Sequence, residues 1–301
     1  MVVVGSAGGV WIDWGRTIGY VEHNGSDLER ARLRGILGRR RPDAKVIRGL
    51  EARQLDDGGF PYGFVQGRPS TVGSTATALA WLDDLGLLDS VHAERAFMFL
   101  LAAQRPDGSW DEPPALLPYG PPPRLVPGDL RVRVASTALV GFWLARAWER
   151  DDAVARAAAY LRAHQAPTGR FMGFLSTTWL AAAMFHMVEG PGSAPAVRAF
   201  DALAAVPADR WRPGALAQAL GALGDGGGSA DVPCVADGLL RLRAACRADG
   251  SWASEDGEAH RAEVTLTALR ALVRYAGQGG GPDRAGDGPA EANTQAEAIT
   301  R

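Results

Sequence analysis

A seven-residue pattern that recurs four times is the strongest constraint on how this chain can fold. It reads QLDDGGF, QRPDGSW, QAPTGRF and CRADGSW, and the copies begin at Gln54, Gln104, Gln165 and Cys246. Each copy has glycine at its fifth position and an aromatic residue at its seventh, namely Gly58 and Phe60, Gly108 and Trp110, Gly169 and Phe171, and Gly250 and Trp252. A unit repeated in this way indicates a repeat architecture.

Each motif lies between two segments with helical periodicity. The segments before the motifs carry charge on one face, which is typical of half-exposed helices; they span residues 43–54, 91–104, 152–165 and 232–246. The segments after the motifs are poorer in charge, which is typical of helices covered on several sides; they span 74–86, 135–148, 176–187 and 263–275. A further pair, 194–206 and 213–224, keeps only Trp211 of the motif, and 27–38 adds one more helix.

The alternation of charged and apolar helices predicts two concentric layers, with the apolar helices inside. The sequence contains about five such helix pairs and one extra helix. Roughly six pairs are enough for the first and last pairs to meet and close a toroid. Helix pairs whose ends do not meet would form an open solenoid instead. We therefore predict an all-α (α/α)6 toroid that forms a single domain over residues 1–277. Residues 278–301 are rich in Gly, Pro and Ala, a composition typical of a disordered tail.

Charge and cysteine content exclude several functions. The 32 Lys and Arg and 34 Asp and Glu residues give a formal net charge of −2, so no basic field for nucleic acid is present. Cys234 and Cys246 form neither a disulfide framework nor a CxxC motif, and no metal site is predicted from them and five scattered histidines. The first residues lack the basic segment and long apolar run of a signal peptide, and no apolar stretch is long enough to span a bilayer. We therefore expect a cytoplasmic protein, and its oligomeric state is left open.

The motif itself is predicted to be a staple between repeats. Its glycine permits the left-handed conformation that ends a helix, and its glutamine amide can satisfy polar groups left unpaired there. The aromatic ring would pack over the neighbouring repeat. The motif residues are therefore expected to be structural.

The four motifs, three of them followed by a Thr-Ala-Leu helix, resemble the QW repeats of the squalene-hopene cyclase and class II terpene cyclase superfamily. That superfamily shares its toroid with the β subunits of protein prenyltransferases, and the resemblance covers roughly residues 41–276. It implies an apolar cavity in which an acid protonates an isoprenoid and aromatic faces stabilise the carbocations. The implied partner is a small isoprenoid, with peripheral membrane contact for its access; no cofactor is implied except Mg²⁺ for a diphosphate substrate.

Candidate substrate-binding residues come from the apolar helices and their first turns. The aromatic candidates are Trp81, Phe142, Trp143, Trp179 and Phe185, and the hydroxyl candidates are Thr75, Thr137 and Thr178. Arg131 and Arg133 stand at a helix start, where an anionic headgroup would also be favoured. Packing of the aromatic rings in a helical core is an equally good explanation for them as a set.

The resembling family takes its acid from the middle Asp of a D-x-D-D-T-A motif. Aligned on Thr77, Thr137 and Thr267, this position holds Thr75, Ala135 and Thr265. None of these is an acid, and the one acidic residue near them is Glu263, which occupies the first position of the motif in the last repeat. We predict Glu263 as the proton donor, with His260 or Asp129 nearby, while a capping role for Glu263 in its helix stays open.

Two other classes of function remain open at this point. A non-catalytic toroid that binds an isoprenoid or another lipid is favoured by the missing acid motif. A prenyltransferase-like or glycosidase-like (α/α)6 enzyme is the other, although 231-DVPC-234 has the wrong spacing for the prenyltransferase zinc ligands. The Pro-rich connection 111–131 is predicted to form a lid over the mouth of the cavity.

Overall fold

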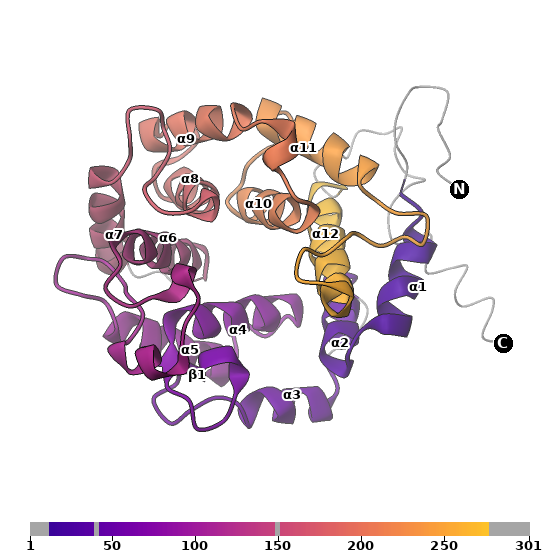
Figure 1. Ribbon diagram of the computed structural model, residues 1–301, viewed down its shortest axis with the longest axis horizontal. Coiled ribbons are helices and arrows are strands. Elements are labelled where there is room, and N and C mark those ends of the chain that lie inside the picture. The colour runs from indigo at the N-terminus through magenta and orange to yellow at the C-terminus, as the bar shows by residue number, and fades with distance from the viewer. Residues whose placement is uncertain (1–11, 39–41, 148–150, 277–301) are drawn as a thin grey trace. The chain divides into compact units, whose positions relative to one another are not determined.

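The computed structural model describes residues 12–38, 42–147 and 151–276, and almost all of their regular structure is helical (Figure 1). The all-α class predicted from the sequence is confirmed. The predicted tail, 278–301, lies outside the described residues. The chain divides into two compact units, Arg41–Ala205, here called the central unit, and Met1–Arg40 with Val206–Arg301, here called the terminal unit.

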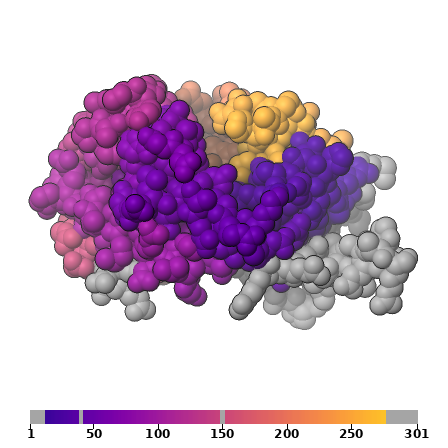
Figure 2. All heavy atoms as spheres, turned by 90° about the horizontal axis from the view of Figure 1, so that it is seen from below, coloured from indigo at the N-terminus to yellow at the C-terminus, as the bar shows by residue number. Residues whose placement is uncertain are grey.

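The central unit contains two layers of helices. The charge-poor helices, called inner helices here, are α4 (Val72–Asp84), α6 (Leu130–Ala147) and α8 (Leu175–Glu189), and the outer helices are α3 (Ala44–Glu51), α5 (Val91–Ala102), α7 (Asp151–Ala163) and α9 (Ala194–Ala204). The three inner helices lie side by side, and α5, α7 and α9 pack against α4, α6 and α8 in turn (Figure 1). The outer helix α3 lies on the face seen in Figure 2 and exposes Lys45 and Arg48.

Short elements connect these helices. A two-stranded antiparallel sheet, β1 (Phe60–Pro61) with β2 (Ser70–Thr71), brackets the loop that carries the 3-10 turn η1 (Tyr62–Phe64). The Pro-rich connection before α6 contains two further 3-10 helices, η2 (Pro114–Tyr119) and η3 (Pro123–Leu125). α6 begins at Leu130 rather than at the predicted residue 135, because the turns that follow Pro123 lead directly into it.

The terminal unit combines both ends of the chain. It contains α1 (Trp14–Asn24), α2 (Asp27–Ile36), α10 (Pro213–Asp225), α11 (Pro233–Ala244) and α12 (Arg261–Ala276), with the turns η4 (Ala208–Arg210) and η5 (Glu258–His260). α12 packs against α10, α1 and α2. The buried residues Val21, Leu33, Leu266 and Leu269 join α1 and α2 to α12 in one apolar cluster. The sequence did not predict α1, whose two glycines weaken its local helical signal.

The motif glutamines tie successive outer helices together in the central unit. In each of three copies the side-chain Nε2 donates to the carbonyl oxygen of the motif glycine and to a carbonyl oxygen in the first turn of the next outer helix. The distances are 2.9 and 2.9 Å for Gln54 to Gly58 and His92, 3.1 and 2.9 Å for Gln104 to Gly108 and Ala153, and 3.0 and 2.8 Å for Gln165 to Gly169 and Pro195. One amide thus fixes both the turn and the neighbouring helix.

The fourth motif makes the same connection without a glutamine. Its turn lies against α1, where Arg16 donates from Nη1 to the carbonyl oxygen of Ala248 (3.0 Å) and Thr17 donates from Oγ1 to that of Gly250 (2.9 Å). The hydrogen-bond donors therefore come from α1, which compensates for the cysteine, Cys246, that stands where the other motifs have glutamine. At the fourth motif α1 takes the place that the next outer helix has at the first three.

Replacing Gly169 by alanine is expected to lower the free energy of unfolding by at least ~2 kcal/mol. Gly169 has φ +85°, and a Cβ there would lie 2.0 Å from the carbonyl oxygen of Arg198 in α9. A left-handed alanine and a backbone clash each oppose the substitution. Gly221 is the matched control: it lies inside α10 with nothing within 4 Å of an added Cβ, so Gly221→Ala should stabilise by about 0.5–1 kcal/mol. If urea unfolding shows that Gly169→Ala is more stable than Gly221→Ala, the close approach between Gly169 and the Arg198 carbonyl is refuted.

Candidate functional site

Four buried threonines hold the motif aromatics onto the inner helices. The backbone N–H of each motif aromatic donates to a threonine Oγ1, over 3.0 Å for Phe60 to Thr75, 3.0 Å for Trp110 to Thr137, 3.3 Å for Phe171 to Thr178 and 3.2 Å for Trp252 to Thr265. All four threonine residues are fully buried. The hydroxyls of Thr75, Thr137 and Thr178, predicted to contact substrate, are therefore used within the scaffold.

These hydrogen bonds also correct the alignment of the repeats. The equivalent threonines are Thr75, Thr137, Thr178 and Thr265, so alignment on Thr77 and Thr267 was wrong by two residues in the first and last repeats. The position two residues before this threonine holds Gly73, Ala135, Ser176 and Glu263, and Glu263 is the one acid in this set.

Glu263 lies in the first turn of α12 and pairs with Arg32 of α2. Arg32 donates from Nη1 to Oε2 over 2.5 Å and from Nη2 to Oε1 over 3.0 Å. The Glu263 side chain is 41% exposed, whereas that of Arg32 is 5% exposed. Both carboxylate oxygens are thus engaged, and donation of a proton from Glu263 requires Arg32 to release one of them.

The two other predicted acid–base residues do not share one environment. His260 ends η5 in the terminal unit and is exposed. Asp129 belongs to the central unit, directly before α6, and accepts from the backbone N–H of Arg131 (2.8 Å) and from its guanidinium Nη2 (2.9 Å). Hydrogen bonds from Arg131 hold the pKa of the Asp129 carboxyl below its usual value. A carboxyl of lowered pKa is ionised at neutral pH and holds no proton to donate, and the hydrogen bond from the backbone N–H of Arg131 gives Asp129 the geometry of a helix cap.

The arginines predicted to hold an anionic headgroup already have carboxylate partners. Arg131 pairs with Asp129 and is 61% exposed. Arg133 pairs with Asp111 over 3.1 Å. Asp111 also accepts from the backbone N–H of Gly128, so it fastens the start of the Pro-rich connection to its end.

Four of the five aromatic candidates are buried in the helical layers. Phe142, Trp143, Trp179 and Phe185 are each at most 4% exposed. Phe142 and Trp143 meet edge to face at 5.4 Å, and Phe185 stacks on the motif residue Phe171 at 5.8 Å. Trp81 differs from them, because it is only partly buried and stacks on Phe64. Packing therefore accounts for the four buried rings, and Trp81 is the aromatic candidate with a partly open surface.

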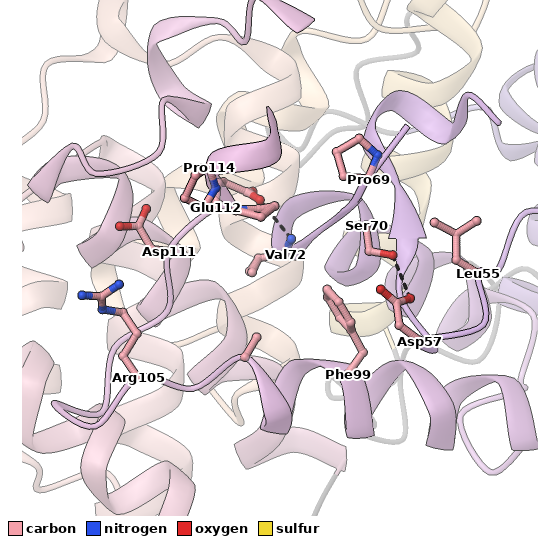
Figure 3. A pocket seen from close by; sticks show the side chains of 12 residues that line it. Leu55, Asp57, Pro69, Ser70, Val72, Phe99, Arg105, Asp111, Glu112 and Pro114 are labelled. Atoms are coloured by element: carbon pink, nitrogen blue, oxygen red, sulfur yellow. Dashed lines mark hydrogen bonds between the residues drawn. The ribbon is translucent and has the colours of Figure 1, made fainter. Parts of the chain in front are cut away.

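A pocket of about 530 Å³ lies in the central unit between the first two motif loops (Figure 3). Its walls are largely apolar, with Leu55, Pro69, Val72, Phe99, Pro113 and Pro114, and its polar lining residues include Asp57, Arg105, Asp111 and Glu112. Its volume is in the range of small-molecule sites. Glu112 was not among the residues predicted from the sequence, although its place two residues after Trp110, at the start of a long connection, was an available signal.

Glu112 is a buried carboxyl at the start of an inner helix. One of its oxygens accepts the backbone N–H of Val72 at the N-terminus of α4 over 3.0 Å (Figure 3). The other accepts the backbone N–H of Gly73 over 2.9 Å. The residue is 2% exposed, and burial raises its pKa to about 7 against these hydrogen bonds. A Cβ on Gly73 would lie 3.0 Å from Oε1, so glycine at this position makes room for the carboxyl.

The Pro-rich connection 111–131 is fixed to its surroundings at several points. Leu116 is fully buried, and the guanidinium of Arg68 lies 5.5 Å from the ring centroid of Tyr119. Its role as a lid stays a prediction. Within the described part of the chain, no group of three or more His, Cys, Asp or Glu side chains is placed to hold a metal ion. No helix among the described residues combines the length and apolarity needed to cross a membrane.

Solved structures provide the comparison that decides the fold. The apo structure of the type II terpene cyclase MstE from Scytonema matches with a TM-score of 0.57 and 18% identity, covering 83% of this chain and 88% of that one. An MstE variant in complex with the substrate geranylgeranyl dihydroxybenzoate matches with a TM-score of 0.56 and 17% identity, covering 87% of each chain. A protein from Actinoplanes matches with a TM-score of 0.54 and 23% identity, covering 83% and 90%.

The fold is that of a type II terpene cyclase. The resemblance seen in the QW motifs is thus confirmed at the level of the all-α toroid, and the match extends over nearly the whole length of the cyclase chain. No protein-family profile matches the sequence, and a search of curated proteins finds no relative. At this low identity the terpene cyclase fold establishes architecture, and the reaction has to be argued from residues.

Proposed function

We propose that this protein cyclises an isoprenoid after protonation by Glu263. The observation that carries the proposal is the position of Glu263, two residues before the repeat threonine Thr265 in a chain with the type II terpene cyclase fold. In this reaction the carboxylic acid gives its proton to an alkene carbon, the resulting tertiary carbocation is attacked by the next alkene, and loss of a proton ends the sequence. The carboxylate regains its proton from solvent.

Two further observations support this proposal. The Glu263 side chain is partly exposed, so a substrate or solvent can reach it. The MstE structures include complexes with geranylgeranyl dihydroxybenzoate as substrate and merosterolic acid A as product, so isoprenoid chemistry is present among proteins of this fold. We extend the isoprenoid substrate class to this chain, with Mg²⁺ as companion if the substrate is a diphosphate and with peripheral membrane contact for substrate access.

Glu263→Gln is expected to reduce turnover at least ~100-fold, because it keeps the shape of the side chain and removes the transferable proton. Purified protein would be incubated with squalene, prenyl diphosphates and prenylated benzoates, and the extracts analysed by mass spectrometry. Glu94→Gln is the matched control, since Glu94 is exposed on the outer helix α5. Turnover within a few-fold of wild type in Glu263→Gln would discard Glu263 as the acid.

Stability has to be measured on the same variants. Glu263→Gln leaves the buried Arg32 guanidinium without its carboxylate, which lowers stability independently of catalysis. The double variant Arg32→Met, Glu263→Gln removes both charges and should recover much of the melting temperature. Loss of turnover in both variants then assigns the effect to the missing acid rather than to unfolding.

A non-catalytic isoprenoid-binding toroid is the second candidate function. It is favoured by the engagement of both Glu263 oxygens with Arg32, which leaves no carboxyl oxygen free in this arrangement. In that case no substrate is converted, yet an isoprenoid raises the melting temperature by binding the folded state. The same incubations, followed by thermal melts, separate the two functions.

A further inference from the structure

The pocket between the first two motif loops has no part in the proposed reaction. All of its lining residues belong to the central unit, and Glu263 is not one of them. Much of its lining is apolar, and three of the lining residues, Pro69, Pro113 and Pro114, are prolines, whose rings have little freedom to move. A pocket of about 530 Å³ with such walls can take the apolar body of a small molecule.

A change in the first motif places its aspartate in this pocket. In the second motif, Oδ1 of Asp107 accepts the hydroxyl of the serine two residues later over 2.6 Å. The first motif has Gly59 at that position, and the hydroxyl comes from Ser70 of β2, which donates to Asp57 Oδ1 over 2.8 Å. A Cβ on Gly59 would lie 2.7 Å from Ser70 Oγ and 3.0 Å from the ring of Phe99. The missing side chain therefore lets β2 and an aromatic ring approach the motif carboxylate.

Asp57 keeps one carboxylate oxygen available. Its Oδ1 accepts the backbone N–H of Gly59 over 2.9 Å as well as the Ser70 hydroxyl. Within the described part of the chain, no donor and no cationic side chain pairs with Oδ2. Figure 3 shows Asp57 and Ser70 on one side of Phe99, and Arg105 on the other. A carboxylate oxygen beside an aromatic ring suits an organic cation, because both attract positive charge.

The charges of the whole lining favour a cation over an anion. The lining contains one guanidinium, that of the exposed Arg105, and three carboxyl groups, those of Asp57, Asp111 and Glu112. Asp111 already pairs with Arg133, and the buried Glu112 accepts two backbone N–H groups. Asp57 is thus the carboxylate with an oxygen left for a ligand, and an anionic ligand would meet more carboxyl groups than guanidinium groups.

We propose that this pocket binds a small organic ammonium compound, whose N–H donates to Asp57 Oδ2 beside the Phe99 ring. Its apolar body lies against the proline, leucine and valine walls, where it is removed from water. The ammonium is primary or secondary, because a quaternary nitrogen has no N–H to donate to the carboxylate. The inference goes beyond the proposed reaction, since nothing in it requires an isoprenoid or an acid.

The test compares phenethylamine, phenethyl alcohol and phenylpropionate by isothermal titration calorimetry at neutral pH. The three probes share one apolar body and carry a positive, a neutral and a negative group. We expect the amine to bind at least ~10-fold more tightly than the alcohol or the acid, the size of a hydrogen bond between charged groups. Asp57→Asn keeps Oδ1 for Gly59 and Ser70 and replaces Oδ2 by an amide N–H. The variant should lose this preference for the amine and bind the alcohol as wild type does.

Two variants control for damage to the motif turn. Asp107→Asn makes the same change in the second motif, where the aspartate does not line the pocket, and should leave the affinity for the amine unchanged. Arg105→Gln leaves the Asp57 turn intact and removes the positive charge from the pocket. It should strengthen binding of the amine and weaken binding of the acid, because the repulsion and the attraction by the guanidinium are both lost.

Three results would overturn the inference. They are failure of the amine to bind wild type, equal affinities for the amine and the alcohol, and an affinity for the amine that Asp57→Asn leaves unchanged, which would place the amine elsewhere in the protein. Each of these results leaves the proposed cyclisation standing. Conversely, a preference for the amine that depends on Asp57 supports the pocket even if no isoprenoid is converted.

Discussion

Replacement of Trp110 by alanine is expected to lower the free energy of unfolding by about 3–5 kcal/mol, the range for a large buried aromatic. The Trp110 residue is fully buried. Its indole Nε1 donates to the carbonyl oxygen of Leu100 over 2.6 Å, and its backbone N–H donates to Thr137. The substitution therefore leaves both a cavity and an unpaired carbonyl at the end of α5. Urea unfolding monitored by circular dichroism measures the loss.

Two further variants test whether the loss of stability is specific to the motif tryptophans. Trp252→Ala should cost a similar amount, because Trp252 is also fully buried and its indole donates to the carbonyl oxygen of Leu242 over 2.7 Å. Leu240→Ala is the control, because Leu240 is 55% exposed on α11. This substitution should change the free energy of unfolding by no more than ~0.5 kcal/mol. Equal stability of Trp110→Ala and Leu240→Ala would refute the structural role of the motif.

Glu112 is expected to make the protein less stable as the pH rises from about 4.5 to about 7. Burial raises the pKa of Glu112 from its usual value of 4.5 to about 7, so the folded state binds more protons than the unfolded state between these values. The contribution of Glu112 is therefore fully present below pH ~4.5 and is lost as the pH rises through ~7. A shift of this size corresponds to up to about 3 kcal/mol.

The comparison with Glu112→Gln isolates this contribution from the other titrating groups. Glutamine stays neutral, so the difference in stability between wild type and variant should fall with rising pH across this window. Glu94→Gln, on the exposed side of α5, should leave the wild-type pH profile unchanged. Urea midpoints measured at several pH values give the profiles, and parallel curves for wild type and Glu112→Gln would show that Glu112 titrates as an ordinary exposed acid.

The helical pairs could be predicted because their signal is local. A helix such as α8, with a buried run from Thr177 to Phe185, has to be apolar on most sides, and an outer helix such as α7 has to keep charges on one face. The motif spacing likewise predicted where outer helices end, since Gly58, Gly108, Gly169 and Gly250 all have positive φ. α1 was missed because its assignment as an outer helix depends on contacts with residues more than two hundred positions away.

The sequence by itself determined the alternating helices, the motif turns and hence the cyclase-like toroid, because these depend on periodicity and on backbone conformations that few residues adopt. The tertiary structure alone decided the register of the repeats, which is set by hydrogen bonds from motif backbone to Thr75 and Thr265. It also decided which aromatics are buried and which, like Trp81, are only partly buried. The raised pKa of Glu112 was beyond sequence reasoning for the same reason: burial comes from segments brought together only when the chain has folded.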